Sequence, residues 1–295
     1  MMSDAYPTRL MPQKDGSTAA LFGPWLLKSA FQPIFDLRSG KAEIAGFEGL
    51  VRPFLSGRGA SPATLFRTTQ GPDRQLLETV TRDLHMMNAA TLPVKNAMLF
   101  INLDPSAFSD RLAIAEALAS VRKQWAKTGA SPRRLVCEIT EFKARSPALL
   151  FTLADTIRAN GFRLAIDDYG SDESDAERLA RLRPDIVKFD GRWITRLMET
   201  KPGYRHIKDM ALSFAERGIA TVFEGIEQLW QLELSESAGA TYVQGYALAR
   251  PEIAPTTFAR FAEAKVQTAR DALRAAALQV TIEDQPGIGY GHRAA

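Results

Sequence analysis

Cysteine is almost absent from the sequence: Cys137 is the single one in 295 residues. One cysteine cannot form an internal disulfide, and it excludes a zinc site built from several thiolates. Because Cys137 lies within an apolar run, we expect a packed core thiol. The three histidines, His85, His206 and His292, fall on predicted helices or in the C-terminal tail. We expect surface or packing roles for them rather than metal binding.

Long apolar segments are also missing. No stretch approaches the roughly 18 apolar residues of a membrane-spanning helix, and residues 1–16 lack the apolar centre of a secretory signal. The net charge is only +3, and the Lys and Arg residues are scattered. This charge pattern gives no support for a nucleic-acid polymer as partner. We therefore expect a cytoplasmic protein without a membrane span.

The composition is that of a folded chain, with 45% hydrophobic and 24% charged residues. This length and composition suit one large domain or two small ones. The polar, Gly- and Pro-containing residues 1–25 predict a tail or docking arm, and we expect the domain itself to span residues 26–262. An Ala-rich pattern at 256–278 predicts a helix that either packs on the domain or projects toward a partner. Residues 263–295 would then hold the end of that helix and a polar tail.

Eight apolar runs predict strands, and helical patterns separate them from the second strand onward. The first two runs are joined by a turn too short for a parallel crossover, so we expect them to be antiparallel. Eight strands with interleaved helices favour an α/β fold, a closed (β/α)8 barrel, over an open doubly wound sheet, although pattern alone does not decide between the two. The eight runs are residues 31–37, 43–52, 98–104, 135–140, 162–168, 186–190, 220–226 and 242–248.

Polar side chains stand where these runs end, beginning with the adjacent pair Asp167 and Asp168. In a barrel the C-terminal strand ends converge on one mouth. Acids gathered there repel one another strongly unless a cation holds them. The pattern therefore predicts a metal site. The side chains concerned are Glu48, Asn102, Glu138, Glu141, Asp167, Asp168, Lys188, Asp190, Glu224, Glu227 and Gln244.

The ligand types indicate which metal and which chemistry. Carboxylates with one amide oxygen suit a hard cation such as Mg²⁺ or Mn²⁺. Two adjacent aspartates allow one carboxylate to bridge two ions, which can stabilise both the attacking and the leaving oxygen at a phosphorus atom. Phosphodiester hydrolysis fits best, and a metal-assisted carbon-acid lyase with Lys188 as base is the alternative.

Each residue taken singly also has a simpler structural interpretation. Lys188 would form an ordinary ion pair with Asp190, and Asn102 would cap the helix that follows it. Gln244 would bond backbone groups at the barrel rim, and Arg52 would be a surface cation. Only the ordered set favours a functional site over these roles.

Eight short motifs occur in the following order: Gln32-Pro33-Ile34, Glu48-Gly49-Leu50-Val51-Arg52, Ile101-Asn102-Leu103, Glu138-Ile139-Thr140-Glu141, Asp167-Asp168-Tyr169-Gly170, Lys188-Phe189-Asp190, Glu224-Gly225-Ile226-Glu227 and Gln244-Gly245-Tyr246. Together they resemble the motifs of the EAL family of cyclic-di-GMP phosphodiesterases, over about residues 30–251. The resemblance implies a modified TIM barrel with an antiparallel first strand. It also implies metal-dependent hydrolysis of cyclic-di-GMP to linear pGpG.

The resemblance further implies roles for individual residues. One metal ion would be bound by Glu48, Asn102, Glu138 and Asp167. A second would be held or positioned by Asp167, Asp168 and Glu224. Lys188 would contact the attacking water or the phosphate, Glu224 or a neighbouring carboxylate would accept the proton, and Gln244 would orient the water. Glu141 would anchor a loop, and the substrate contacts would be Gln32, Leu50, Arg52, Asp190 and Glu227.

Two departures from the family pattern stand out. Gly49 replaces the usual Ala, and we expect this to do little beyond loosening the backbone. Residues 171–176 carry extra acids beside a site for an anionic dinucleotide. An active phosphodiesterase and a catalytically inactive EAL domain, acting as a cyclic-di-GMP receptor or a protein-interaction module, are therefore both open. The sequence leaves a homodimer or a regulatory protein partner open as well.

Overall fold

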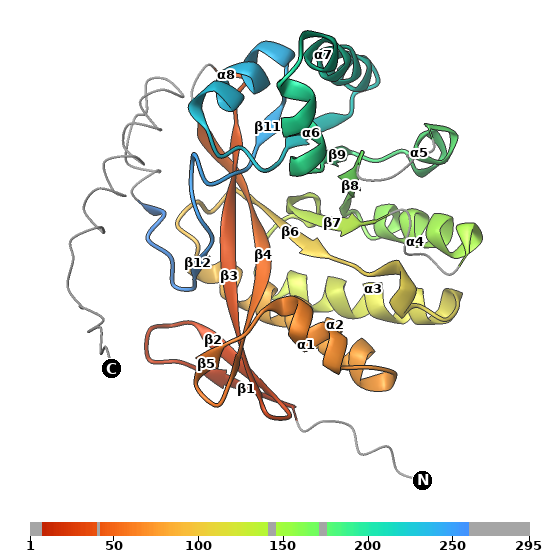
Figure 1. Ribbon diagram of the computed structural model, residues 1–295. Helices are drawn as coiled ribbons and strands as arrows, with labels where there is room; N and C mark the ends of the chain where they lie inside the picture. The colour runs from red at the N-terminus through yellow and green to blue at the C-terminus, as the bar shows by residue number, and fades with distance from the viewer. Residues whose placement is uncertain (1–7, 40–41, 141–145, 171–175, 260–295) are drawn as a thin grey trace, which may run out of the picture.

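A closed barrel of strands forms the centre of the computed structural model, which describes residues 8–39, 42–140, 146–170 and 176–259 (Figure 1). Each barrel strand pairs with the next, and the last returns to the first. The neighbours from β4 to β11 are parallel, whereas β3 is antiparallel to both β4 and β11. The predicted barrel with an antiparallel first strand is confirmed. Its strands are β3 (Trp25–Asp36), β4 (Glu43–Leu55), β6 (Met98–Asn102), β7 (Leu135–Ile139), β8 (Arg163–Tyr169), β9 (Ile186–Phe189), β10 (Ala220–Phe223) and β11 (Tyr242–Val243).

Strands β3 and β4 are longer than the sequence pattern predicted. They pair from Trp25 opposite Leu55 to Asp36 opposite Glu43. In the added part of β3, buried and half-buried residues alternate, and the polar residues Lys28 and Ser29 separate it from the predicted apolar run 31–37. There β3 pairs with β2 (Thr18–Phe22), while the end of β4 pairs with the short β5 (Arg58–Gly59).

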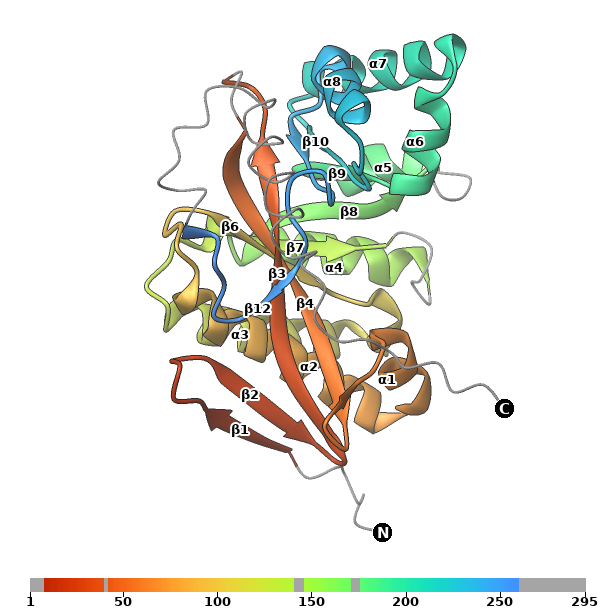
Figure 2. The same ribbon diagram turned by 60° about the vertical axis from the view of Figure 1, so that its left-hand side comes forward.

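Helices cover the outer face of the parallel strands (Figures 1 and 2). One was marked in the sequence by Ser146 and Pro147, and it begins there: the Ser146 hydroxyl accepts a hydrogen bond from the Leu149 amide at 3.2 Å. The helices are α1 (Pro62–Thr68), α2 (Pro72–Asn88), α3 (Arg111–Ala126), α4 (Pro147–Ala159), α5 (Ala176–Leu182), α6 (Gly191–Met198), α7 (Lys201–Glu216) and α8 (Leu229–Ala238).

Residues 8–22, which we expected to lie in a tail, form an ordered hairpin instead. Strand β1 (Thr8–Pro12) pairs with β2, and β2 pairs with β3 (Figure 2). Ala20 and Phe22 point into a small core with Leu27, while Leu21 between them is exposed. The turn between the strands is closed by a hydrogen bond from the Gln13 amide to the Ser17 carbonyl.

At the other end of the chain, β12 (Glu252–Ile253) pairs with β3. Most of the helix predicted at 256–278 lies outside the described residues, which end at 259. Within the ranges that the structure describes, no helix has the length and apolar character needed to cross a membrane.

A buried polar network joins the hairpin, β3 and α2. Asn88 accepts a hydrogen bond from the Thr18 amide at 2.7 Å and donates to the Ser29 hydroxyl at 3.0 Å. That hydroxyl lies 2.9 Å from Nδ1 of His85. Burial, with a smaller contribution from the charge of Arg52, lowers the pKa of His85 to about 3. The imidazole is therefore neutral at every physiological pH.

This shift predicts acid sensitivity of the fold. The folded-state pKa of His85 lies below its ordinary 6.5. As the pH falls, His85 is therefore protonated in the unfolded chain while it stays neutral in the folded chain. The contribution of His85 to the free energy of unfolding should then decrease by about 1.4 kcal/mol per pH unit below about pH 5.5. Urea unfolding at pH 5.5 and 4.5 measures this slope. A His85→Asn variant should show a shallower slope by that amount, and equal slopes would contradict the assignment.

Candidate functional site

The candidate site is one layer of the barrel interior. Side chains alternate along a strand, so an interior residue is followed by another two positions later. A layer of apolar residues fills the barrel and consists of Ile34, Met98, Phe100, Val136, Ala165, Ile186, Val222 and Tyr242. Two positions further toward the mouth on each strand stand polar residues: Gln32, Asn102, Glu138, Asp167, Lys188, Glu224 and Gln244. Glu48 follows Gly46 in the same way.

Lys188 lies at the centre of this polar layer. Its Nζ is 2.7 Å from an oxygen of Glu138 and 2.7 Å from one of Glu224, 3.0 Å from Asp167 and 3.7 Å from Glu48. The Lys188 side chain is 1% exposed and that of Glu138 is 0% exposed. One buried ammonium therefore faces four carboxylates.

The simpler pairing of Lys188 with Asp190 is not what the structure shows. Asp190 accepts a hydrogen bond from the Trp193 amide at 2.8 Å and caps the N-terminus of α6. It does not line the cavity that holds the acids. The geometry thus gives Asp190 a structural role, and its contact with a substrate stays a prediction.

The electrostatics of the layer show an excess of negative charge. Burial alone would lower the pKa of Lys188, but the surrounding carboxylates outweigh burial and raise it well above its usual value. Burial raises the pKa of Glu138 and raises that of Glu224 to about 8, although Lys188 opposes both shifts. At neutral pH the cluster thus keeps the lysine charged and holds a proton on a carboxyl group. A cation bound beside these carboxylates would displace that proton.

A local irregularity brings Asp167 and Asp168 to the same side. In a regular strand, neighbouring residues point to opposite faces. Here the pairing of β8 with β9 shifts register between Ile166 and Tyr169, and Asp168 has a positive φ of 57°. Such a bulge redirects a side chain, and Asp is one of the residues that tolerate this conformation. Carboxylate oxygens of Asp167, Asp168 and Glu224 consequently lie within 4.8 Å of one another.

The donor set fits a hard divalent cation. Oε2 of Glu138 and the amide oxygen of Gln244 are buried and accept no hydrogen bond, whereas Oε1 of Glu138 and Oδ1 of Asp167 are paired with the Lys188 ammonium. These atoms are acceptors that a cation would satisfy. Asn102 pairs in register with Glu138 on the adjacent strand and is exposed, and it lines the neighbouring cavity rather than the one over the acids.

A cavity of about 380 Å³ opens onto the cluster. Gln244 donates a hydrogen bond to Glu48 at 2.7 Å across it, and Gln32 lies in its wall, 3.5 Å from the Ala249 carbonyl. Glu227 and Tyr246 form part of the exposed rim. The predicted loop anchor Glu141 and residues 171–175 of the divergent loop lie outside the described residues.

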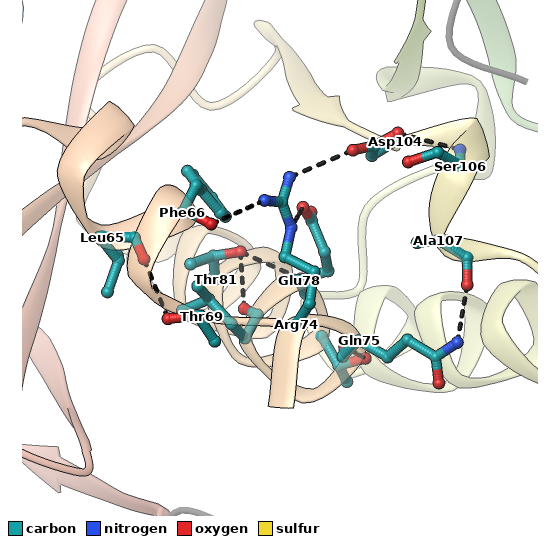
Figure 3. Close-up of polar contacts among 12 residues, drawn as sticks. Leu65, Phe66, Thr69, Arg74, Gln75, Glu78, Thr81, Asp104, Ser106 and Ala107 are labelled. Carbon is teal, nitrogen blue, oxygen red and sulfur yellow. Dashed lines mark hydrogen bonds and ion pairs between the residues drawn. The ribbon is translucent and has the colours of Figure 1, made fainter. Parts of the chain in front are cut away.

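A neighbouring cavity of about 280 Å³ is lined by two predicted substrate contacts, Leu50 and Arg52, and by the predicted metal ligand Asn102. Its wall is held together by Arg74, shown at the centre of Figure 3. The guanidinium donates to Glu78 at 3.0 Å, to Asp104 at 3.1 Å and to the Phe66 carbonyl at 3.1 Å. These bonds tie α1 and α2 to the segment that follows β6.

Two further residues of this wall, Glu78 and Arg82, were missed by sequence reasoning. Both are buried on α2, and their charged groups lie 3.8 Å apart. Burial raises the pKa of Glu78 and lowers that of Arg82. The signal was present in the sequence, since an acid and a base four positions apart mark one face of a helix. Their position beside the site depends on the packing of α2 against β4, which the sequence does not show.

Comparison with known proteins decides the family. The sequence profile of the EAL domain matches residues 26–251. The chain belongs to the EAL domain family. Among its relatives is YkuI, an uncharacterised EAL-domain-containing protein of Bacillus subtilis, 28% identical over 225 residues, which are 75% of this chain and 54% of YkuI. Escherichia coli PdeN, described as a probable cyclic di-GMP phosphodiesterase, is 28% identical over 75% of this chain and 43% of PdeN.

Solved EAL structures share the fold. The crystal structure of YkuI in complex with substrate c-di-GMP and calcium matches with a TM-score of 0.68 at 22% identity, over 87% of this chain and 62% of that one. Klebsiella pneumoniae BlrP1 in a manganese/cy-diGMP complex matches with a TM-score of 0.69 at 24% identity, over 84% and 60% of the chains. This EAL chain spans only about half the length of YkuI and less of PdeN.

Removing the central ammonium should destabilise the metal-free EAL barrel. In a Lys188→Met variant the four carboxylates lose their counter-charge, and we expect the free energy of unfolding in EDTA to fall by about 3–5 kcal/mol. Added Mn²⁺ should then raise the melting temperature more than it does in the unaltered chain. Lys95→Met is the matched control, because Lys95 is exposed and its Nζ bonds the Ala90 carbonyl. Equal stability of the two variants in EDTA would contradict the role given to Lys188.

Proposed function

We propose that the chain is a metal-dependent phosphodiesterase that hydrolyses cyclic-di-GMP to linear pGpG. The observation that carries this proposal is the convergence of Glu48, Glu138, Asp167 and Glu224 on one barrel mouth around Lys188. Membership of the EAL family supports it, as do the cyclic-di-GMP complexes of YkuI and BlrP1 and the activity given to PdeN.

The metal requirement follows from the donor set. We assign Glu48, Asn102, Glu138 and Asp167 to one ion, and Asp167, Asp168 and Glu224 to a second. All donors are oxygens, which favours Mg²⁺ or Mn²⁺. When bound, two such ions would polarise the phosphodiester and lower the pKa of a water molecule.

The other functions belong to side chains of the chain itself. Lys188 supplies a fixed positive charge that would attract a phosphate oxygen. Glu224, whose pKa is raised to about 8 without a bound metal, would accept a proton from the attacking water once further positive charge has displaced its own proton. Gln244 is held by its bond to Glu48, and its amide oxygen is buried without a partner. That oxygen would orient the water.

Substrate binding is assigned to the two adjoining cavities. Gln32 and Glu227 line the cavity over the acids, whereas Leu50 and Arg52 line the neighbouring one. The planar guanidinium of Arg52 matches the geometry of a phosphate group. Cyclic-di-GMP carries two phosphates and two bases, so a ligand of this size would extend from one cavity into the other.

Turnover tests the proposal. Purified chain incubated with cyclic-di-GMP and Mn²⁺ should give pGpG, measured by chromatography, and EDTA should abolish it. Glu224→Gln should lower the rate by about 10²–10⁴-fold because it removes the proton acceptor. Glu48→Gln should also abolish the reaction by weakening a metal ligand. Glu216→Gln, an exposed change on α7, is the control that should leave the rate unchanged.

The outcomes separate the candidate functions. No pGpG above the level of Glu48→Gln would contradict a phosphodiesterase. Saturable binding of cyclic-di-GMP without turnover would indicate a receptor, and absence of binding would indicate an interaction module.

A further inference from the structure

Gly49 lies between the candidate site and helix α2. From Glu48 onward, β4 alternates between half-buried residues, Glu48, Leu50 and Arg52, and buried ones, Gly49 and Val51. Val51 packs in the core that includes Leu77 and Leu84 of α2. The Gly49 position therefore faces α2, while the neighbouring Glu48 faces the barrel mouth.

The space that a side chain at position 49 would need is occupied by His85. A Cβ atom built on Gly49 would lie 2.8 Å from Cγ of His85, and 3.0 Å from both its Cβ and its Cδ2. Real Cβ atoms do not approach heavy atoms to 2.8 Å, so one of the two partners would have to move. The contact involves the root of the imidazole side chain rather than a flexible tip.

His85 is held where it is. The residue is 4% exposed, and its Nδ1 lies 2.9 Å from the Ser29 hydroxyl, which Asn88 also contacts. The imidazole packs edge-on against Phe31, with ring centroids 6.2 Å apart, and Phe31 is the register partner of Gly49. On α2 itself, Leu77 and Leu84 are completely buried. A methyl group at position 49 would thus force β4 and His85 apart.

We propose that Gly49 and His85 form a size-matched pair that fixes the position of β4 and, through it, of Glu48. His85 is then a positioning residue for Glu48, and this role rests on the proposed function of Glu48 as a metal ligand. We had expected the glycine only to loosen the backbone, whereas the structure shows that a larger residue at position 49 would collide with His85. Metal ligands tolerate displacements of only about 0.5 Å, so a small shift of β4 would be felt at the site.

A double-mutant cycle tests the pair, with Gly49→Ala made in the unaltered chain and in a His85→Ala background. Two quantities are measured: the melting temperature in EDTA, and the Mn²⁺ concentration that gives half of the Mn²⁺-induced rise in melting temperature. In the unaltered chain, Gly49→Ala should lower the melting temperature by roughly 5 °C and raise the Mn²⁺ midpoint about tenfold. In the His85→Ala background, both effects should disappear.

Gly46→Ala is the matched control on the same strand. A Cβ at Gly46 would lie 2.7 Å from the Phe100 ring and does not have His85 among its nearest atoms. This change should therefore lower the melting temperature equally in both backgrounds. Comparing Gly49→Ala with Gly46→Ala shows whether His85→Ala relieves the contact at position 49 specifically or loosens the packing of the whole core.

Each outcome bears on a different part of the proposal. If Gly49→Ala costs the same with and without His85, the pair is refuted. If the melting temperature shows the coupling but the Mn²⁺ midpoint does not, the positioning role is refuted. An unaltered chain that shows no response to Mn²⁺ contradicts the proposed function and the positioning role with it, while the coupling in melting temperature still judges the pair.

Discussion

The ion cluster around Lys188 is the constraint on which the barrel mouth depends. Four carboxylates from β4, β7, β8 and the end of β10 meet one almost fully buried ammonium group from β9. Removing such charges from water is costly, and the attraction to a single cation compensates for only part of it. The cluster is therefore arranged for more positive charge than the chain itself supplies, and divalent cations are the simplest source.

The barrel geometry explains why these groups meet. A packed apolar layer fills the interior, and the polar layer stands two residues beyond it on each strand. The same alternation that buries Val136 and Val222 below directs Glu138 and Glu224 into the mouth. The residues that pack the barrel interior and the residues that form the site are thus two positions apart on each strand. The departures from regular geometry, the bulge at Asp168 and the close approach at Gly49, occur beside this layer.

Apolar runs separated by helical patterns made the barrel predictable, and the acids that end these runs, which form most of the polar layer, are visible in the sequence. The hairpin at residues 8–22 was not predicted because its strands are short and its core partners come from β3, β4, α1 and α2. The direction of the Asp168 side chain depends on a backbone bulge that the residue types do not predict. The capping role of Asp190 and the contact between Gly49 and His85 depend equally on tertiary packing, which only the structure shows.

Counting the bound metal ions tests the central claim most directly. Mn²⁺ is titrated into the chain in the presence of cyclic-di-GMP, and the free ion is followed by electron paramagnetic resonance. The account predicts that two Mn²⁺ ions bind per chain, and that Asp168→Asn binds fewer under the same conditions. A chain that binds no Mn²⁺ at millimolar concentration would contradict it.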